Sequence, residues 1–221
     1  MAELRVKSTG TLKLFESDNT SSVTIASPAS LGGDRTVTLP DASVTLASGT
    51  MLATDGDGSS LTGLTPGITE ADQWRITSAF QNTAQPIASN WERNDTEFEK
   101  IGTGMTESSG VFTFPSTGKW SIRMSSSLYI DNAAERSAGA DLELSVNAGG
   151  AWSTIVAKSS SMYDSGTNTS ANVFGEAIVD VTNTTNYLIR MSAIVVNSVT
   201  WTTGSTTRQN TGMTFLKLGD T

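Results

Sequence analysis

The stretch GVFTFPSTGKWSIRM, residues 110–124, contains two alternating runs separated by a break. Residues 111–114 end one candidate strand, and residues 120–124 begin another, in which every second side chain is apolar. Between them, Pro115 has no N–H to donate to a β-ladder, and Gly118 can adopt backbone conformations that other residues avoid. The stretch therefore predicts a corner between two strands and not one long strand.

The alternation continues outward from this corner. Trp120, Ile122, Met124, Leu128 and Ile130 share one parity, and polar residues fill most of the other. Alternation with a period of two is typical of a half-buried strand. Similar runs recur at residues 142–146, 152–156, 177–181, 188–196 and 213–218. Without a convincing long amphipathic helix, about eight strands with polar loops predict an all-β antiparallel sandwich or jelly roll.

The beginning of the chain has a different pattern. Five very short candidate strands lie there, at residues 4–7, 11–15, 22–26, 35–39 and 44–47. Each carries roughly two apolar side chains, which is too few for an independent core. We therefore expect an intertwined region that completes its core against other chains. The predicted division is an anchor or stalk at 1–52, a Gly/Ser/Pro-rich linker at 53–71 and a head domain at 72–221.

Composition excludes several functions. The chain has 14 basic and 22 acidic residues, a formal net charge of −8 and a sequence pI of ≈ 4.5. Such a chain is repelled by phosphate backbones, so nucleic acid is not an expected partner. Cysteine and histidine are both absent, which removes thiolates, disulfides and imidazole ligands or bases. We expect no enzyme activity, no cofactor and no metal.

The sequence also indicates no membrane partner. The first ten residues, MAELRVKSTG, carry charges where a signal peptide needs an apolar core. The most apolar stretch, from Leu188, includes Arg190 and is shorter than the ~20 residues of a membrane span. We expect synthesis in a cytoplasm, with any external location reached by assembly or lysis.

The opening stretch resembles a known family. Gly110, Phe112, Gly118, Trp120 and Ile122 are spaced as in the head domains of the tumour-necrosis-factor (TNF) and complement-collagen superfamily. The resemblance covers roughly residues 72–220. It implies a TNF-like jelly roll, a strand at residues 97–101 and a homotrimer.

The first third is similar to segments of bacteriophage structural proteins. The runs that carry this resemblance are KLFESDN (13–19), RTVTLP (35–40) and MLATDGDG (51–58). It implies a virion surface protein. The favoured interpretation is a trimeric capsid decoration (cement) protein, anchored to the major capsid protein by its N-terminal region with the head projecting outward. The alternative is a tail-fibre or spike tip, bound to a tail protein, that recognises a host polysaccharide or protein.

Two sets of contact residues follow from this interpretation. Trp201, among polar residues near a predicted loop, is a candidate exposed contact. The candidate capsid or stalk contacts combine apolar side chains with a local basic excess: Leu4, Arg5, Val6, Lys7, Leu12, Lys13, Leu14 and Phe15. A stalk core explains the apolar members equally well.

Acidic residues leave weaker alternatives open. Asp131, Glu135, Asp141 and Glu143 could converge as glycan-cleaving carboxylates or as a calcium site. We expect instead that Asp131 and Glu135 lie in a polar loop and that Glu143 faces solvent. The run DGDG at 55–58 favours a tight turn over calcium. The remaining tryptophans are predicted core or subunit-interface anchors: Trp74, Trp91, Trp120 and Trp152.

Overall fold

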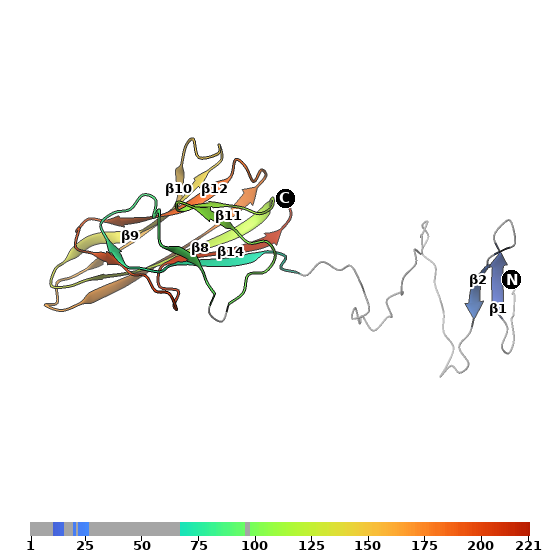
Figure 1. Cartoon of the computed structure of the whole chain (residues 1–221), viewed down its shortest axis with the longest axis horizontal. Helices are drawn as coiled ribbons and strands as arrows, with labels where there is room; N and C mark the ends of the chain where they lie inside the picture. The colour runs from blue at the N-terminus through green and yellow to red at the C-terminus, as the bar shows by residue number, and fades with distance from the viewer. Residues whose placement is uncertain (1–10, 16–19, 21, 27–66, 96–97) are drawn as a thin grey trace, which may run out of the picture. The chain divides into compact units, whose positions relative to one another are not determined.

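The structure, a computed structural model, describes residues 11–15, 20, 22–26, 67–95 and 98–221. The chain divides into two units, Met1–Thr62 and Gly63–Thr221. In the first, β1 (Thr11–Phe15) pairs antiparallel with β2 (Ser22–Ala26) (Figure 1). Both strands have their predicted bounds. The other three predicted strands and the DGDG run lie outside the described residues, and the domain boundaries stay predictions.

The second unit contains a five-stranded and a seven-stranded sheet (Figure 1). The five-stranded sheet has the order β10 (Ser153–Met162), β9 (Glu135–Ser145), β12 (Leu188–Val195), β7 (Val111–Thr113) and β6 (Thr106–Ser108). The seven-stranded sheet has the order β4 (Phe80–Gln81), β13 (Trp201–Thr202), β8 (Gly118–Ile130), β14 (Gly212–Gly219), β3 (Ala71–Ile76) and β5 (Trp91–Arg93), and β11 (Thr169–Val181) pairs with β8. All these pairings are antiparallel. The predicted all-β antiparallel sandwich is confirmed.

The corner that decided the prediction is present. β7 ends at Thr113, and β8 begins at Gly118, whose φ of 142° lies outside the range that side chains favour. A Cβ atom there would stand 2.5 Å from the carbonyl oxygen of Gly219. Trp120 Nε1 donates to the carbonyl of Ser116 at 3.2 Å, which fixes the turn from inside.

β8 supplies the centre of the core. Its even-numbered side chains are buried from Trp120 to Ile130, and odd-numbered ones such as Arg123 point outward. Phe112 from the opposite sheet meets the rings of Trp74 and Trp91 edge-on, at centroid distances of 5.4 and 5.0 Å. Each fully buried large apolar side chain stabilises the fold by about 1.5–3 kcal/mol. Together these side chains hold the two sheets as one sandwich. The prediction of core tryptophans is confirmed for Trp74, Trp91 and Trp120.

The predicted strand at 97–101 is wrong over its described part. Residues 98–100 are not in a strand, and Ile101 forms an isolated bridge with Ala71. The chain then turns, because the Glu70 carboxylate accepts the backbone N–H groups of Thr103 and Gly104, at 3.1 and 2.9 Å. These side chain–backbone hydrogen bonds replace a ladder beyond Ile101.

Candidate functional site

The predicted anchor residues fall in two groups. Leu12, Lys13, Leu14 and Phe15 lie on β1. Leu4, Arg5, Val6 and Lys7 lie outside the described residues. Their contact with a capsid or with a stalk core stays a prediction.

A surface that sequence reasoning did not single out lies on the seven-stranded sheet. We call the outward side of β11, β8, β14 and β3 the sheet face. Phe174 and Ile178 project from it on β11, with exposures of 57% and 67%. Ile178 stands in register with Ser121, and Ser121 in turn with Leu216. Contiguous exposed apolar patches mark interaction sites, so what matters here is whether these side chains continue into a larger apolar surface.

An apolar pocket adjoins the sheet face at the edge of the sandwich. We call it the edge pocket; its volume is about 430 Å³. β9, β10, β11 and the turn before β12 line it, through Leu144, Val146, Ile155, Ala177, Ile178, Val179, Asp180 and Tyr187. Ile178 belongs both to this pocket and to the sheet face, so the two surfaces are continuous.

A second, more polar pocket of about 230 Å³ lies on the sheet face itself. Phe174, Arg123, Ser125 and two glutamines are among its lining residues. The Asn94 side chain donates to both glutamines, to Gln73 Oε1 and to Gln209 Oε1. Gln209 Nε2 donates to the carbonyl of Trp74 at 3.1 Å, and Gln73 Nε2 donates to Thr214 Oγ1 at 3.0 Å. The amide wall of this pocket is therefore held in place before any ligand arrives.

The prediction that Glu143 faces solvent is wrong. It is buried, and it accepts two hydrogen bonds from Arg190, at 3.1 and 3.2 Å, and one from Ser192. The Arg190 guanidinium also lies 4.2 Å from the centroid of the Trp152 ring. Alternation correctly put Glu143 on the outward side of β9, but Arg190 and Ser192 from β12 bind it there.

Glu135 does not lie in a polar loop. It begins β9 and is only 1% exposed. Its carboxylate accepts the N–H groups of Ser137 and Asn197, both at 2.8 Å, and the Thr200 hydroxyl at 2.7 Å. Glu135 therefore ties the loop after β12 to the start of β9. Asp131 is exposed in the preceding turn, as predicted.

Asp141 is the fourth of these carboxylates. It lines a pocket of about 220 Å³ on the outward side of the five-stranded sheet, with Lys158, Ile194 and small residues. Burial, and then the nearby Glu143 charge, raise the pKa of Asp141 above its usual value of 3.8. Within the described ranges, no group of three or more His, Cys, Asp or Glu side chains could hold a metal ion.

Trp201 is half-buried on β13. Its ring stacks on that of Tyr129, its neighbour on β8, with centroids 5.8 Å apart and planes 2° from parallel. The Thr200–Glu135 hydrogen bond holds the preceding residue. The Trp201 ring is therefore packed on Tyr129 and only partly exposed. Its contact with a partner stays a prediction.

Comparison with known proteins bears on the fold. No helix in the described part of the chain is long and apolar enough to cross a membrane. No protein-family model matches the sequence. No curated protein sequence matches it either.

Solved structures do match. Eiger TNF from S. frugiperda superposes with a TM-score of 0.52 and 12% identity, over 68% of this chain and 93% of that chain. Murine APRIL superposes with a TM-score of 0.45 and 12% identity, over 67% of this chain and 98% of that chain. The likeness to Eiger TNF is one of fold. This chain therefore contains a TNF-like jelly-roll β-sandwich, as residues 110–122 indicated.

Proposed function

We propose that this chain is a non-catalytic surface protein whose TNF-like head assembles into a homotrimer through the sheet face and the edge pocket. The observation that carries the proposal is their continuity at Ile178, which is 67% exposed although it is large and apolar. Burying such side chains against a second copy is favourable by roughly 25 cal/mol per Å² of apolar area.

The use of two different surfaces favours a ring over a two-fold pair. The sheet face and the edge pocket are different surfaces, so the edge of one copy packing on the face of the next forms a heterologous contact. Such contacts close into rings when the rotation closes. The superfamily that residues 110–122 resemble is trimeric, which supports a ring of three.

We assign the trimer to the surface of a bacteriophage virion, as a capsid decoration (cement) protein that its N-terminal region anchors to the major capsid protein. The support lies in the runs at 13–19, 35–40 and 51–58 and in the thin apolar content of the first 52 residues. The absence of His and Cys, together with the bonded state of Glu135 and Glu143, supports a structural and not a catalytic role.

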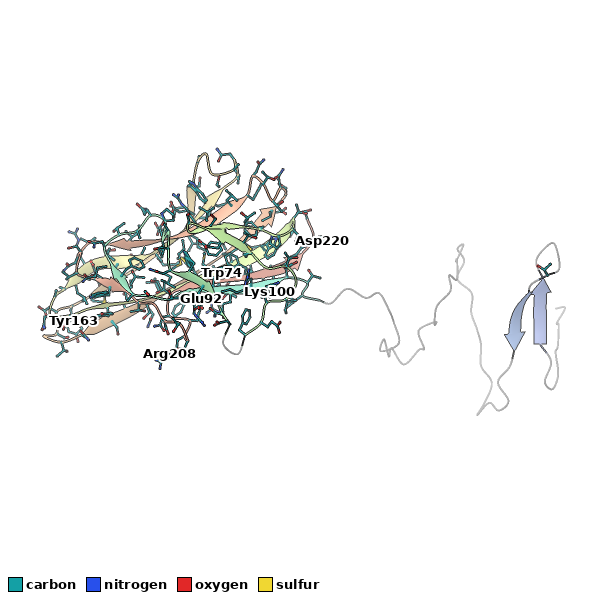
Figure 2. All side chains as sticks on the ribbon, viewed as in Figure 1. Trp74, Glu92, Lys100, Tyr163, Arg208 and Asp220 are labelled. Atoms are coloured by element: carbon teal, nitrogen blue, oxygen red, sulfur yellow. The ribbon has the colours of Figure 1, made fainter. Side chains whose placement is uncertain are left out.

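One observation favours the alternative, a tail-fibre or spike tip that binds a host-surface glycan or protein. The Tyr129–Trp201 stack is an ordered aromatic pair of the kind that often carries binding energy. Tyr163 lies at one end of the second unit and Asp220 at the other (Figure 2). The strand register puts the aromatic pair next to Ile130, at the end of β8 distant from Gly118.

A charge substitution tests the assembly surface. Ile178→Asp should lower the trimer fraction of the full chain in sedimentation velocity, because it buries a carboxylate in an apolar contact. The matched control is Tyr163→Asp, at a residue that is 74% exposed on the β10–β11 loop. Full assembly of Ile178→Asp, or equal loss in both variants, would contradict the proposed surface.

Copy number tests the virion assignment. Purified particles from a phage that encodes this chain would be quantified by mass spectrometry against the major capsid protein. Hundreds of copies per particle are expected for a decoration protein, whereas a handful would indicate the tail-fibre alternative. Absence from the particle would overturn both virion roles and leave the trimer to be judged separately.

A further inference from the structure

Arg123 is a cation on the sheet face. It is exposed at the middle of β8 and lines the sheet-face pocket between Phe174 and Thr214. Within residues 67–95 and 98–221 its guanidinium has no hydrogen bond and no ion pair. The other arginine on this face, Arg75, is saturated, because Glu92 and Asp95 bind it at 2.9 and 2.6 Å.

Glu176 is the corresponding anion. It projects from β11 on the same face, in register with Arg123. Its carboxylate accepts the Ser121 hydroxyl at 2.6 Å, and no cation among the described residues binds it. The neighbouring carboxylate, Asp180, is already paired with Lys119 at 3.0 Å. Arg123 and Glu176 thus stand directly opposite each other on this face, and neither has an ion-pair partner within 4.0 Å among the described residues.

A second copy that covers the sheet face removes water from these two charges. A guanidinium that loses water without a partner costs several kcal/mol, so once this face is covered Arg123 needs an acceptor, which either its own chain or the neighbouring copy supplies. Register restricts the choice. Arg123 and Glu176 share one row across β8 and β11. In a ring whose axis runs along the strands, that row lies at one height in every copy. The Glu176 of a neighbour is then level with Arg123.

We propose that Arg123 of each copy pairs with Glu176 of the neighbouring copy, so that these ion pairs set the register and direction of the ring. This inference rests on the proposed self-association. Each copy donates one guanidinium and accepts one, as a closed cyclic assembly requires. Complementary charges at an interface chiefly determine orientation and partner choice.

Charge reversal tests the pair in the full-length protein. Arg123→Glu and Glu176→Arg should each weaken assembly about tenfold or more in sedimentation velocity, because each puts like charges together. The double variant Arg123→Glu/Glu176→Arg should regain most of the affinity. Arg136→Glu is the control, since Arg136 is an exposed arginine on β9, in the other sheet. If Arg123→Glu folds poorly, Arg123→Gln takes its place. It removes the charge without reversing it, so its loss of assembly should be smaller.

Mixing separates a pair between copies from a pair within one chain. The two single variants, weakly assembled alone, should partly regain assembly when combined, because two of the three contacts in a mixed trimer then join opposite charges while the third keeps like charges. Rescue in the double variant with no gain at all on mixing would assign the pair to one chain and overturn the inference. So would a loss no greater than that of Arg136→Glu, which would leave the trimer itself intact. A monomeric wild-type protein would instead remove the proposed self-association.

Discussion

Gly175 on β11 lies so close to Val156 on β10 that a Cβ atom at Gly175 would stand 2.5 Å from Val156 Cγ1. The same atom would be 2.9 Å from Met124 Cε. β10 and β11 belong to different sheets, so this contact closes one edge of the sandwich. The edge pocket and the outward side chains of β11 depend on that closure for their positions.

Gly175→Ala is therefore expected to destabilise the head by about 1–3 kcal/mol, the usual cost of forcing an extra methyl group into a packed site. Urea unfolding at one fixed protein concentration measures the loss. Gly219→Ala is the matched control, because nothing lies within 4 Å of a Cβ atom at that position. Equal stability of the two variants would show that β10 and β11 are not closely packed at Gly175.

Asp72 organises the polar end of the core. It is 1% exposed and accepts hydrogen bonds from Arg93 Nε at 3.0 Å, Trp74 Nε1 at 2.9 Å and the Met105 N–H at 2.7 Å. Asp72→Ala leaves these donors without an acceptor, and we expect a loss of about 3–5 kcal/mol in unfolding free energy.

Asp180→Ala provides the comparison for Asp72→Ala. Its ion pair with Lys119 is half exposed on both sides, so its removal should cost at most about 1 kcal/mol. The same urea titration measures both variants. A similar small cost for Asp72→Ala would mean that its buried hydrogen bonds do not hold the fold.

The pH dependence of Asp141 has a definite sign. Burial first, and the Glu143 charge second, raise the pKa of Asp141 above 3.8, so the charged form is less favourable in the folded state than in the unfolded state. Protonation of Asp141 therefore stabilises the folded state. This contribution is complete below pH 3.8 and is lost as the pH rises through the raised folded pKa. Asp141→Asn should thus match the wild type in acid and exceed its stability near neutral pH. Urea unfolding across that pH range measures the difference. A variant with a lower free energy of unfolding than the wild type at neutral pH would contradict this.

Glu135 should control the loop after β12. Glu135→Ala removes the acceptor of the Asn197 N–H and of the Thr200 hydroxyl. Amide hydrogen exchange at Asn197 should accelerate in this variant, whereas exchange in β8 should change little. The fluorescence of Trp201, one residue beyond Thr200, provides a second readout. Unchanged protection at Asn197 would show that Glu135 does not order the loop.

Local pattern was enough for much of the fold. The bounds of β1 and β2 and the alternation along β8 follow from turns and a period of two, which depend on neighbouring residues only. The corner before Gly118 was predictable for the same reason. The bridge at Ile101 was not, because the backbone there follows carboxylates of Glu70 and Asp72 more than thirty residues earlier.

The candidate site could not be read from local pattern. Alternation assigns Glu143 to the outward side of its strand, but Arg190, 47 residues later, covers it. Likewise, Arg123 and Glu176 become neighbours only through the register of β8 with β11. Periodicity gives the side of a sheet on which a residue lies. It does not say which distant side chain lies above it.

The molecular mass of the full chain in solution tests the central claim, self-association of the TNF-like head, most directly. Sedimentation equilibrium at micromolar concentration should give three times the chain mass of 23.2 kDa. A single species of 23.2 kDa, unchanged as the concentration is raised, would contradict the account.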